Sequence, residues 1–191
     1  GAILYTGKVE GVIPAKGGKP QVLRLINEML SQPRLKQSPP TNLTALLETA
    51  LRTFRRRSLV FIVSDFISLP GWDKPLGMLT QRHEVLAVRL YDPREFELPD
   101  IGPAVLEDAE TGEQLLIDSH DSQFRQRFVE AARRREYELY ATFHRLGVDV
   151  LALSTEDDLV RQIVRFATVR RQRKKAPASF ARAQAGGLPR R

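Results

Sequence analysis

The sequence predicts an α/β fold with a doubly wound, mostly parallel sheet. From Leu59 onward, short apolar runs typical of strands alternate with stretches whose apolar residues recur every three or four positions, as in amphipathic helices. The run Leu59–Val63 is apolar throughout, which is typical of a strand buried on both faces. At 191 residues, the chain has the length of one good-sized domain.

The composition excludes several kinds of chemistry. Cysteine is absent, which rules out cysteine-ligated zinc, thiolate catalysis and disulfides and suits a reducing cytoplasm. No apolar run approaches the roughly 18 residues needed to span a bilayer. The net charge of +7 comes from the end of the chain, because residues 170–191 hold eight Arg or Lys and no acid. Residues 1–169 are therefore predicted to form the folded body, and residues 170–191 a disordered basic tail.

Local patterns predict the elements in order. Ala2–Thr6 and Val9–Ile13 are expected to form a hairpin around Gly7. The later elements are expected as helices over residues 21–31, 41–57, 72–81, 121–146 and 157–169, strands over 59–64, 84–91 and 148–153, and an inserted hairpin over about 104–118, with a Pro-rich loop over 32–40. Helical spacing predicts that Tyr137, Tyr140 and Phe143 face the core.

Polar residues follow the predicted strands directly. Asp65 and Asp92 follow two of them, and Ser154 and Thr155 follow the last. The carboxyl ends of parallel strands meet at one edge, where ligands of open α/β sheets bind, and oxygen ligands suit Mg²⁺. The same residue types are also common helix caps and turn formers, and Thr41 stands where it would cap the following helix. Both interpretations stay open on the residues alone.

Two segments resemble known proteins. TNLTALLETALR followed by RRRSLVFIVSDF is similar to the second half of a von Willebrand factor A domain. The stretch from Arg82 to Asp118, including Asp92–Pro99 and Asp108–Gly112, resembles the bacterial family called domain of unknown function fifty-eight, and the likeness covers about residues 1–170. Members of that family are von Willebrand A-like and are usually encoded beside MoxR-type AAA+ ATPases.

The resemblance implies a metal-ion-dependent adhesion site to which Thr41 and Asp65 belong. It also implies a first strand, followed by an Asp-x-Ser-x-Ser loop, that this chain lacks. That strand would lie between Ala2–Thr6 and Leu59–Ser64. An intact protein that carries this loop is accordingly expected to bind Mg²⁺, whereas this chain, with Thr41 and Asp65 alone, is not expected to bind it tightly.

Catalytic motifs are missing. The sequence has no G-x-x-x-x-G-K-[ST] loop and no G-x-S-x-G elbow, and His83, His120 and His144 share no metal-ligand spacing. Asp65 and Asp92 remain as an acid/base pair for a metal-dependent hydrolase, a weaker hypothesis without a nucleophile or cofactor motif.

We therefore expect a non-enzymatic, cytoplasmic protein-interaction module. The resemblance implies an adaptor or co-chaperone that partners a MoxR-type AAA+ ATPase and acts on a client protein. The alternative is a binder of nucleic acid or of an anionic membrane surface, acting through the basic tail.

Overall fold

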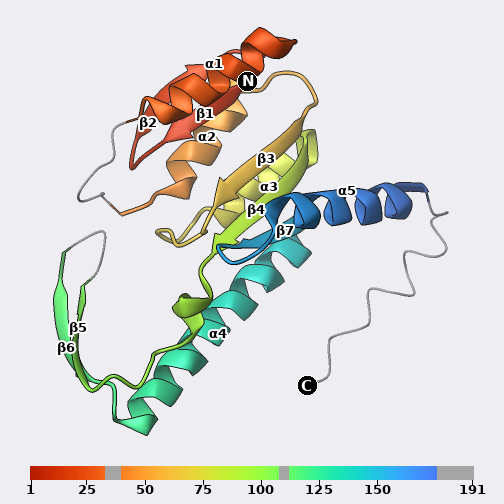
Figure 1. Ribbon diagram of the computed structural model, residues 1–191. Helices are drawn as coiled ribbons and strands as arrows, with labels where there is room; N and C mark the ends of the chain where they lie inside the picture. The colour runs from red at the N-terminus through yellow and green to blue at the C-terminus, as the bar shows by residue number, and fades with distance from the viewer. Residues whose placement is uncertain (33–39, 108–111, 176–191) are drawn as a thin grey trace.

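The computed structural model describes residues 1–32, 40–107 and 112–175 (Figure 1). Its elements follow the order β1 (Ala2–Tyr5), β2 (Val9–Ile13), α1 (Lys19–Leu30), α2 (Leu43–Thr53), β3 (Leu59–Ser64), α3 (Asp73–Arg82), β4 (Glu84–Tyr91), the 3-10 helix η1 (Pro93–Phe96), β5 (Pro103–Glu107), β6 (Gln114–Asp118), α4 (Ser122–Arg145), β7 (Asp149–Ser154) and α5 (Leu159–Lys175).

The strands form three separate sheets in the described residues. The central sheet is parallel and has the order β3-β4-β7, with Val60 opposite Val85 and Ala87 opposite Val150. The hairpins β1-β2 and β5-β6 are antiparallel sheets of two strands each. The α/β class, the parallel sheet and the inserted hairpin are confirmed. The single larger sheet is not observed, because the N-terminal hairpin does not pair with β3.

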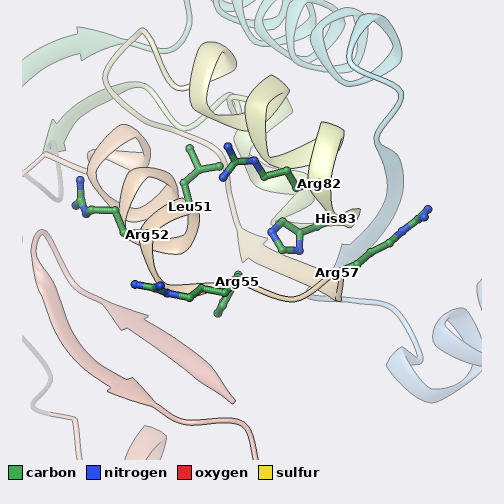
Figure 2. A pocket seen from close by; sticks show the side chains of 7 residues that line it. Leu51, Arg52, Arg55, Arg57, Arg82 and His83 are labelled. Atoms are coloured by element: carbon green, nitrogen blue, oxygen red, sulfur yellow. The ribbon is translucent and has the colours of Figure 1, made fainter.

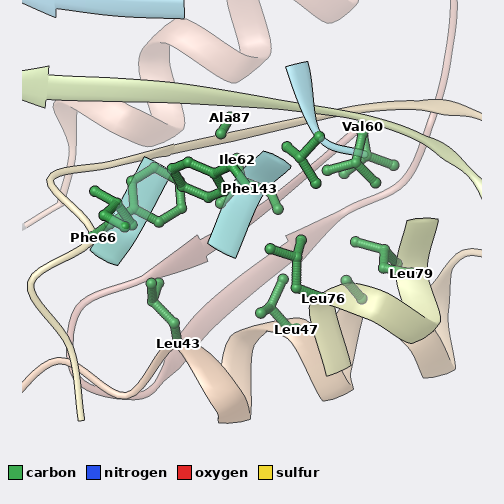
Figure 3. Close-up of a cluster of buried hydrophobic side chains, with 13 residues drawn as sticks. Leu43, Leu47, Val60, Ile62, Phe66, Leu76, Leu79, Ala87 and Phe143 are labelled. Atoms are coloured by element: carbon green, nitrogen blue, oxygen red, sulfur yellow. The ribbon is translucent and has the colours of Figure 1, made fainter. Parts of the chain in front are cut away.

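One face of the parallel sheet carries the main core. Val60, Ile62 and Ala87 point from the sheet into a cluster with α2, α3 and α4 (Figure 3). Leu76 and Leu79 of α3 are fully buried there, and burial of each leucine contributes about 1.5–3 kcal/mol. The residues of this cluster are Leu43, Leu47, Ala50, Val60, Ile62, Phe66, Leu76, Leu79, Val85, Ala87, Leu139, Phe143 and Val148.

The opposite face is only partly covered. Phe166 of α5 packs on a second cluster formed by Leu86, Val88, Leu151 and Leu153 of β4 and β7. The outward side chains of β3 share that face by register but stay exposed, with exposed fractions of 46 % for Leu59, 56 % for Phe61 and 61 % for Val63. The prediction that this strand is buried on both faces is therefore wrong. The reason is its position, because β3 is an edge strand and α5 packs on the β7 side of the sheet (Figure 1).

Two details at the helices differ from expectation. Asn42, not Thr41, caps α2, since its Oδ1 accepts a hydrogen bond from Ala45 N at 3.2 Å. Helix α5 continues to Lys175, so residues 170–175 are helical and not part of a disordered tail, while residues 176–191 lie outside the described residues. Residues 108–111 of the predicted hairpin turn also lie outside them.

The long helix α4 buries fewer aromatic rings than its spacing predicts. Phe143 is buried, but Tyr140 is 36 % exposed and Tyr137 is 69 % exposed. Leu139 and Phe143 are four residues apart and share the face of α4 that meets the core, whereas Tyr137, two residues before Leu139, points away from that face. The N-terminal half of α4 extends past the sheet (Figure 1). The buried positions of the helix are confined to Leu139 and Phe143 near its C-terminal end.

Candidate functional site

The carboxyl edge of the parallel sheet is where the sequence places its candidate residues. β3, β4 and β7 end at Ser64, Tyr91 and Ser154, so the residues that follow emerge at the same edge. Thr155 N donates to Tyr91 O at 3.0 Å, and Thr155 Oγ1 donates to Asp92 Oδ2 at 3.2 Å. The structure therefore brings Asp92 and Thr155 together as predicted.

Asp65 shapes the turn that leaves β3. Its Oδ1 accepts hydrogen bonds from Ile67 N at 3.0 Å and Ser64 Oγ at 3.3 Å. The next residue, Phe66, has a φ of 58°, which is rare for a residue with a large side chain. Phe66 is buried against Phe143, with ring centroids 4.9 Å apart, and this packing holds the unusual backbone in place.

Thr41 meets the same turn through its backbone. Its carbonyl oxygen accepts from Ser68 Oγ at 3.0 Å and from Leu69 N at 2.9 Å. Ser68 Oγ also accepts from Leu43 N at 3.0 Å, so one hydroxyl joins the turn to the first residue of α2. The structure thus places the Thr41 and Asp65 segments side by side. Sequence reasoning missed Ser68, because no spacing rule marks a serine whose partners are 25 and 27 residues away.

The donor set at this edge does not suit a metal ion by itself. No group of three or more His, Asp or Glu residues within the described chain is placed to hold one. Asp92 is also engaged, since its side chain accepts from Arg94 N at 2.9 Å while its own N–H donates to Glu95 Oε1 at 3.1 Å, a capping box at η1. Thr41 and Asp65 therefore offer part of a coordination shell at most.

A buried arginine stands beneath this edge. Arg89 of β4 forms ion pairs with Glu95 of η1 at 3.3 Å and Glu136 of α4 at 3.2 Å, and it also donates to Leu90 O. Its guanidinium carbon lies 5.7 Å from the centre of the Tyr91 ring. Arg89 thus ties η1 and α4 to the sheet. The sequence signals these ion pairs only by placing an arginine among the apolar residues of the predicted strand.

The opposite, amino edge of the sheet holds a cavity of about 480 Å³. This amino-edge cavity lies where α2 and α3 end and where β3 and β4 begin. Its lining residues are Leu51, Arg52, Phe54, Arg55, Arg57, Arg82 and His83. Figure 2 shows the His83 ring between Arg82 and Arg55, while Arg57 extends away from the other arginines. No spacing rule connects Arg55 and Arg57 with His83, because they lie 26 or more residues apart in separate predicted elements.

The first residue of the predicted basic tail forms ion pairs with acids of the central sheet. The Arg170 guanidinium binds Asp149 at 2.9 Å and also pairs with Glu84. This charge is therefore neutralised within the protein. The helices of the described chain include none that is long and apolar enough to cross a bilayer.

Comparison with known proteins places the chain in a family. The model of the family described as "Protein of unknown function DUF58" matches residues 1–138. The chain belongs to the DUF58 family. This DUF58 chain is 37 % identical to the uncharacterized protein MAV169 of Mycobacterium avium over 162 residues, which are 84 % of the chain and 94 % of MAV169. It is 33 % identical over 172 residues to the uncharacterized protein Mb1516 of Mycobacterium bovis, which covers 90 % of the chain and 54 % of that protein. The uncharacterized protein MT1527 of Mycobacterium tuberculosis shows the same identity and the same coverage.

The chain thus spans about half the length of these last two relatives. No solved structure is significantly similar to it.

Proposed function

We propose that this chain is the larger part of a von Willebrand A-like protein-interaction module that is not an enzyme and that works in the cytoplasm. The partner is the one implied by the sequence resemblance, a MoxR-type AAA+ ATPase, with the module acting as adaptor or co-chaperone for a client protein. The observation that supports this proposal best is the open edge of β3.

The edge of β3 has the properties of an unfilled docking position. β3 pairs with β4 on one side, and no strand of the described residues pairs with its other side. Its outward side chains Leu59, Phe61 and Val63 are exposed. An exposed apolar edge strand normally associates with another chain segment. The N-terminal hairpin forms a separate sheet, although Ile3 of β1 packs against the same core as β3.

We assign this position to a further strand that a longer polypeptide supplies. Relatives that are about twice as long as the region matched here represent such a polypeptide. One strand beside β3 would pair with the open backbone groups of its edge and extend the parallel sheet toward the hairpin. The completed carboxyl edge, with Thr41 and Asp65, would then face the protein partner.

The decisive test is a pull-down with the purified MoxR-type ATPase from the same organism. We expect the longer polypeptide to retain the ATPase, and we expect the complex to survive removal of residues 176–191. Asp65→Asn should weaken it, because this change removes a charge at the carboxyl edge but keeps an oxygen that accepts from Ile67 N. Asp73→Asn is the matched control, since Asp73 lies on α3 and pairs with Arg145 at the surface.

Two outcomes would contradict the proposal. One is failure of the longer polypeptide to retain the ATPase. The other is binding that disappears with residues 176–191 and falls steeply with salt, which would favour the nucleic-acid or anionic-surface binder. Substrate turnover abolished by Asp65→Ala would instead support the hydrolase hypothesis.

A further inference from the structure

We propose that the amino-edge cavity binds a small organic phosphate through the guanidinium groups of Arg52, Arg55 and Arg82 and the imidazole of His83. This inference is independent of the proposed function, because the cavity lies at the opposite edge of the sheet from Thr41 and Asp65.

His83 is the first observation that points to a ligand. Its side chain is only 5 % exposed, yet neither ring nitrogen has a hydrogen-bond partner among the described residues. Buried polar atoms in folded proteins are almost always hydrogen-bonded. The imidazole and the Phe54 ring pack nearly perpendicular to each other, with centroids 6.0 Å apart, which fixes the orientation of His83 on the cavity wall. Both ring nitrogens are covered by neighbouring atoms, so the imidazole can offer its donor and acceptor to a bound molecule once the adjoining arginine side chains turn toward that molecule.

The charges around the ring are the second observation. Within the described chain, Arg55 and Arg82 form no ion pair, while Arg52 pairs loosely with Glu48 at 3.7 Å and donates to Thr49 Oγ1 at 3.2 Å, both at the surface. Glu84, the acid next to His83, is bound by Arg170. The C-terminal ends of α2 and α3 also meet this edge, but each helix end carries only about half a negative charge. The positive charge of three guanidinium groups exceeds the negative charge of the two helix ends, so the cavity favours an anion.

The donors and the size of the cavity favour a phosphate on an organic group. A guanidinium binds phosphate oxygens through two parallel N–H donors, and a phosphate offers more oxygens and more charge than one carboxylate. Three arginines and an imidazole therefore suit one or two phosphate groups. The volume of about 480 Å³ lies within the range of small-molecule sites, and Leu51 and Phe54 give the wall an apolar part for the organic group.

The test is an NMR titration of the ¹⁵N-labelled full chain with adenosine diphosphate at about 150 mM salt, where long-range attraction to exposed basic residues is screened. We expect saturable shifts of the amides of residues 51–57 and 82–84. Inorganic phosphate should move the same amides more weakly, and adenosine should not move them. Arg55→Gln and Arg82→Gln should each weaken adenosine diphosphate binding about tenfold, the effect of losing a charged hydrogen bond. Both side chains are exposed, so the fold should be preserved.

Arg56→Gln is the matched control, because Arg56 is an exposed neighbour with the same charge and does not line the cavity. We expect it to bind like the unaltered chain. Equal weakening by Arg56→Gln and Arg55→Gln would overturn the proposal, as would shifts confined to residues 170–191. Absence of any shift at millimolar adenosine diphosphate and phosphate would also overturn it.

Discussion

The side chains of Arg89 and Tyr140 meet charged neighbours between β4 and α4. Arg89 is buried and holds Glu95 and Glu136, while Tyr140 packs edge-on against Phe143 with centroids 6.4 Å apart. The pKa of Tyr140 is raised above its ordinary value of 10.0, mainly because burial disfavours the phenolate and also because the Glu136 carboxylate repels it. Arg89 opposes this effect without cancelling it.

The raised pKa of Tyr140 gives a prediction for alkaline pH. The folded chain holds the phenol proton more tightly than the unfolded chain, so this contribution to stability is complete below the unfolded value near pH 10. It is lost as the pH rises from there through the folded pKa. A titration of phenolate absorbance should show one of the four tyrosines ionising later than the others.

Two variants check that assignment. Tyr140→Phe should remove the late step and make the unfolding free energy depend less on pH above 10. Tyr137→Phe is the control, because Tyr137 lies on the same helix but is largely exposed, and it should leave the late step in place. A late step that persists in Tyr140→Phe would contradict the assignment.

Among the elements, α2 connects the two edges of the sheet. Its beginning is joined to the turn after β3 by Ser68, and its end lines the amino-edge cavity through Leu51 and Arg52. Leu43 and Leu47 of α2 are buried in the main core between these edges. A change at the cap of this helix therefore affects the candidate site through the position of the whole helix.

The cap itself yields a prediction. Asn42→Ala should lower the unfolding free energy by about 1 kcal/mol, because Ala45 N loses its side-chain acceptor. Asn42→Ser should stay close to the unaltered chain, since serine is also a good N-cap. Chemical denaturation of Asn42→Ala, Asn42→Ser and the unaltered chain measures the three unfolding free energies. Equal stability of Asn42→Ala and the unaltered chain would show that another residue caps α2.

For the whole molecule, the prediction concerns metal binding. Calorimetric titration with millimolar Mg²⁺ should show no saturable heat, because one Asp65 oxygen is engaged in the turn and no group of three acidic or histidine side chains is assembled in the described residues. Asp65→Asn should give the same trace. A clear isotherm that Asp65→Asn abolishes would show that Thr41 and Asp65 bind the ion without the expected loop.

The sequence alone determined the elements that depend on local pattern. The apolar run at Leu59–Ser64 and the three- and four-residue spacing after Leu43 fix a strand and a helix, because side-chain periodicity is a property of neighbouring residues. The predicted strands also locate their own carboxyl ends, and these ends form the common edge that carries Asp65, Asp92 and Thr155.

Only the tertiary structure decided which faces and which polar atoms are covered. It left one face of β3 exposed, joined Ser68 to Thr41, and buried His83 beside Arg55 and Arg82 with no hydrogen-bond partner in the part of the chain that the structure describes. These facts depend on segments separated by roughly 25 residues or more along the chain. Local periodicity cannot specify such contacts, because they arise from how helices and strands pack against each other.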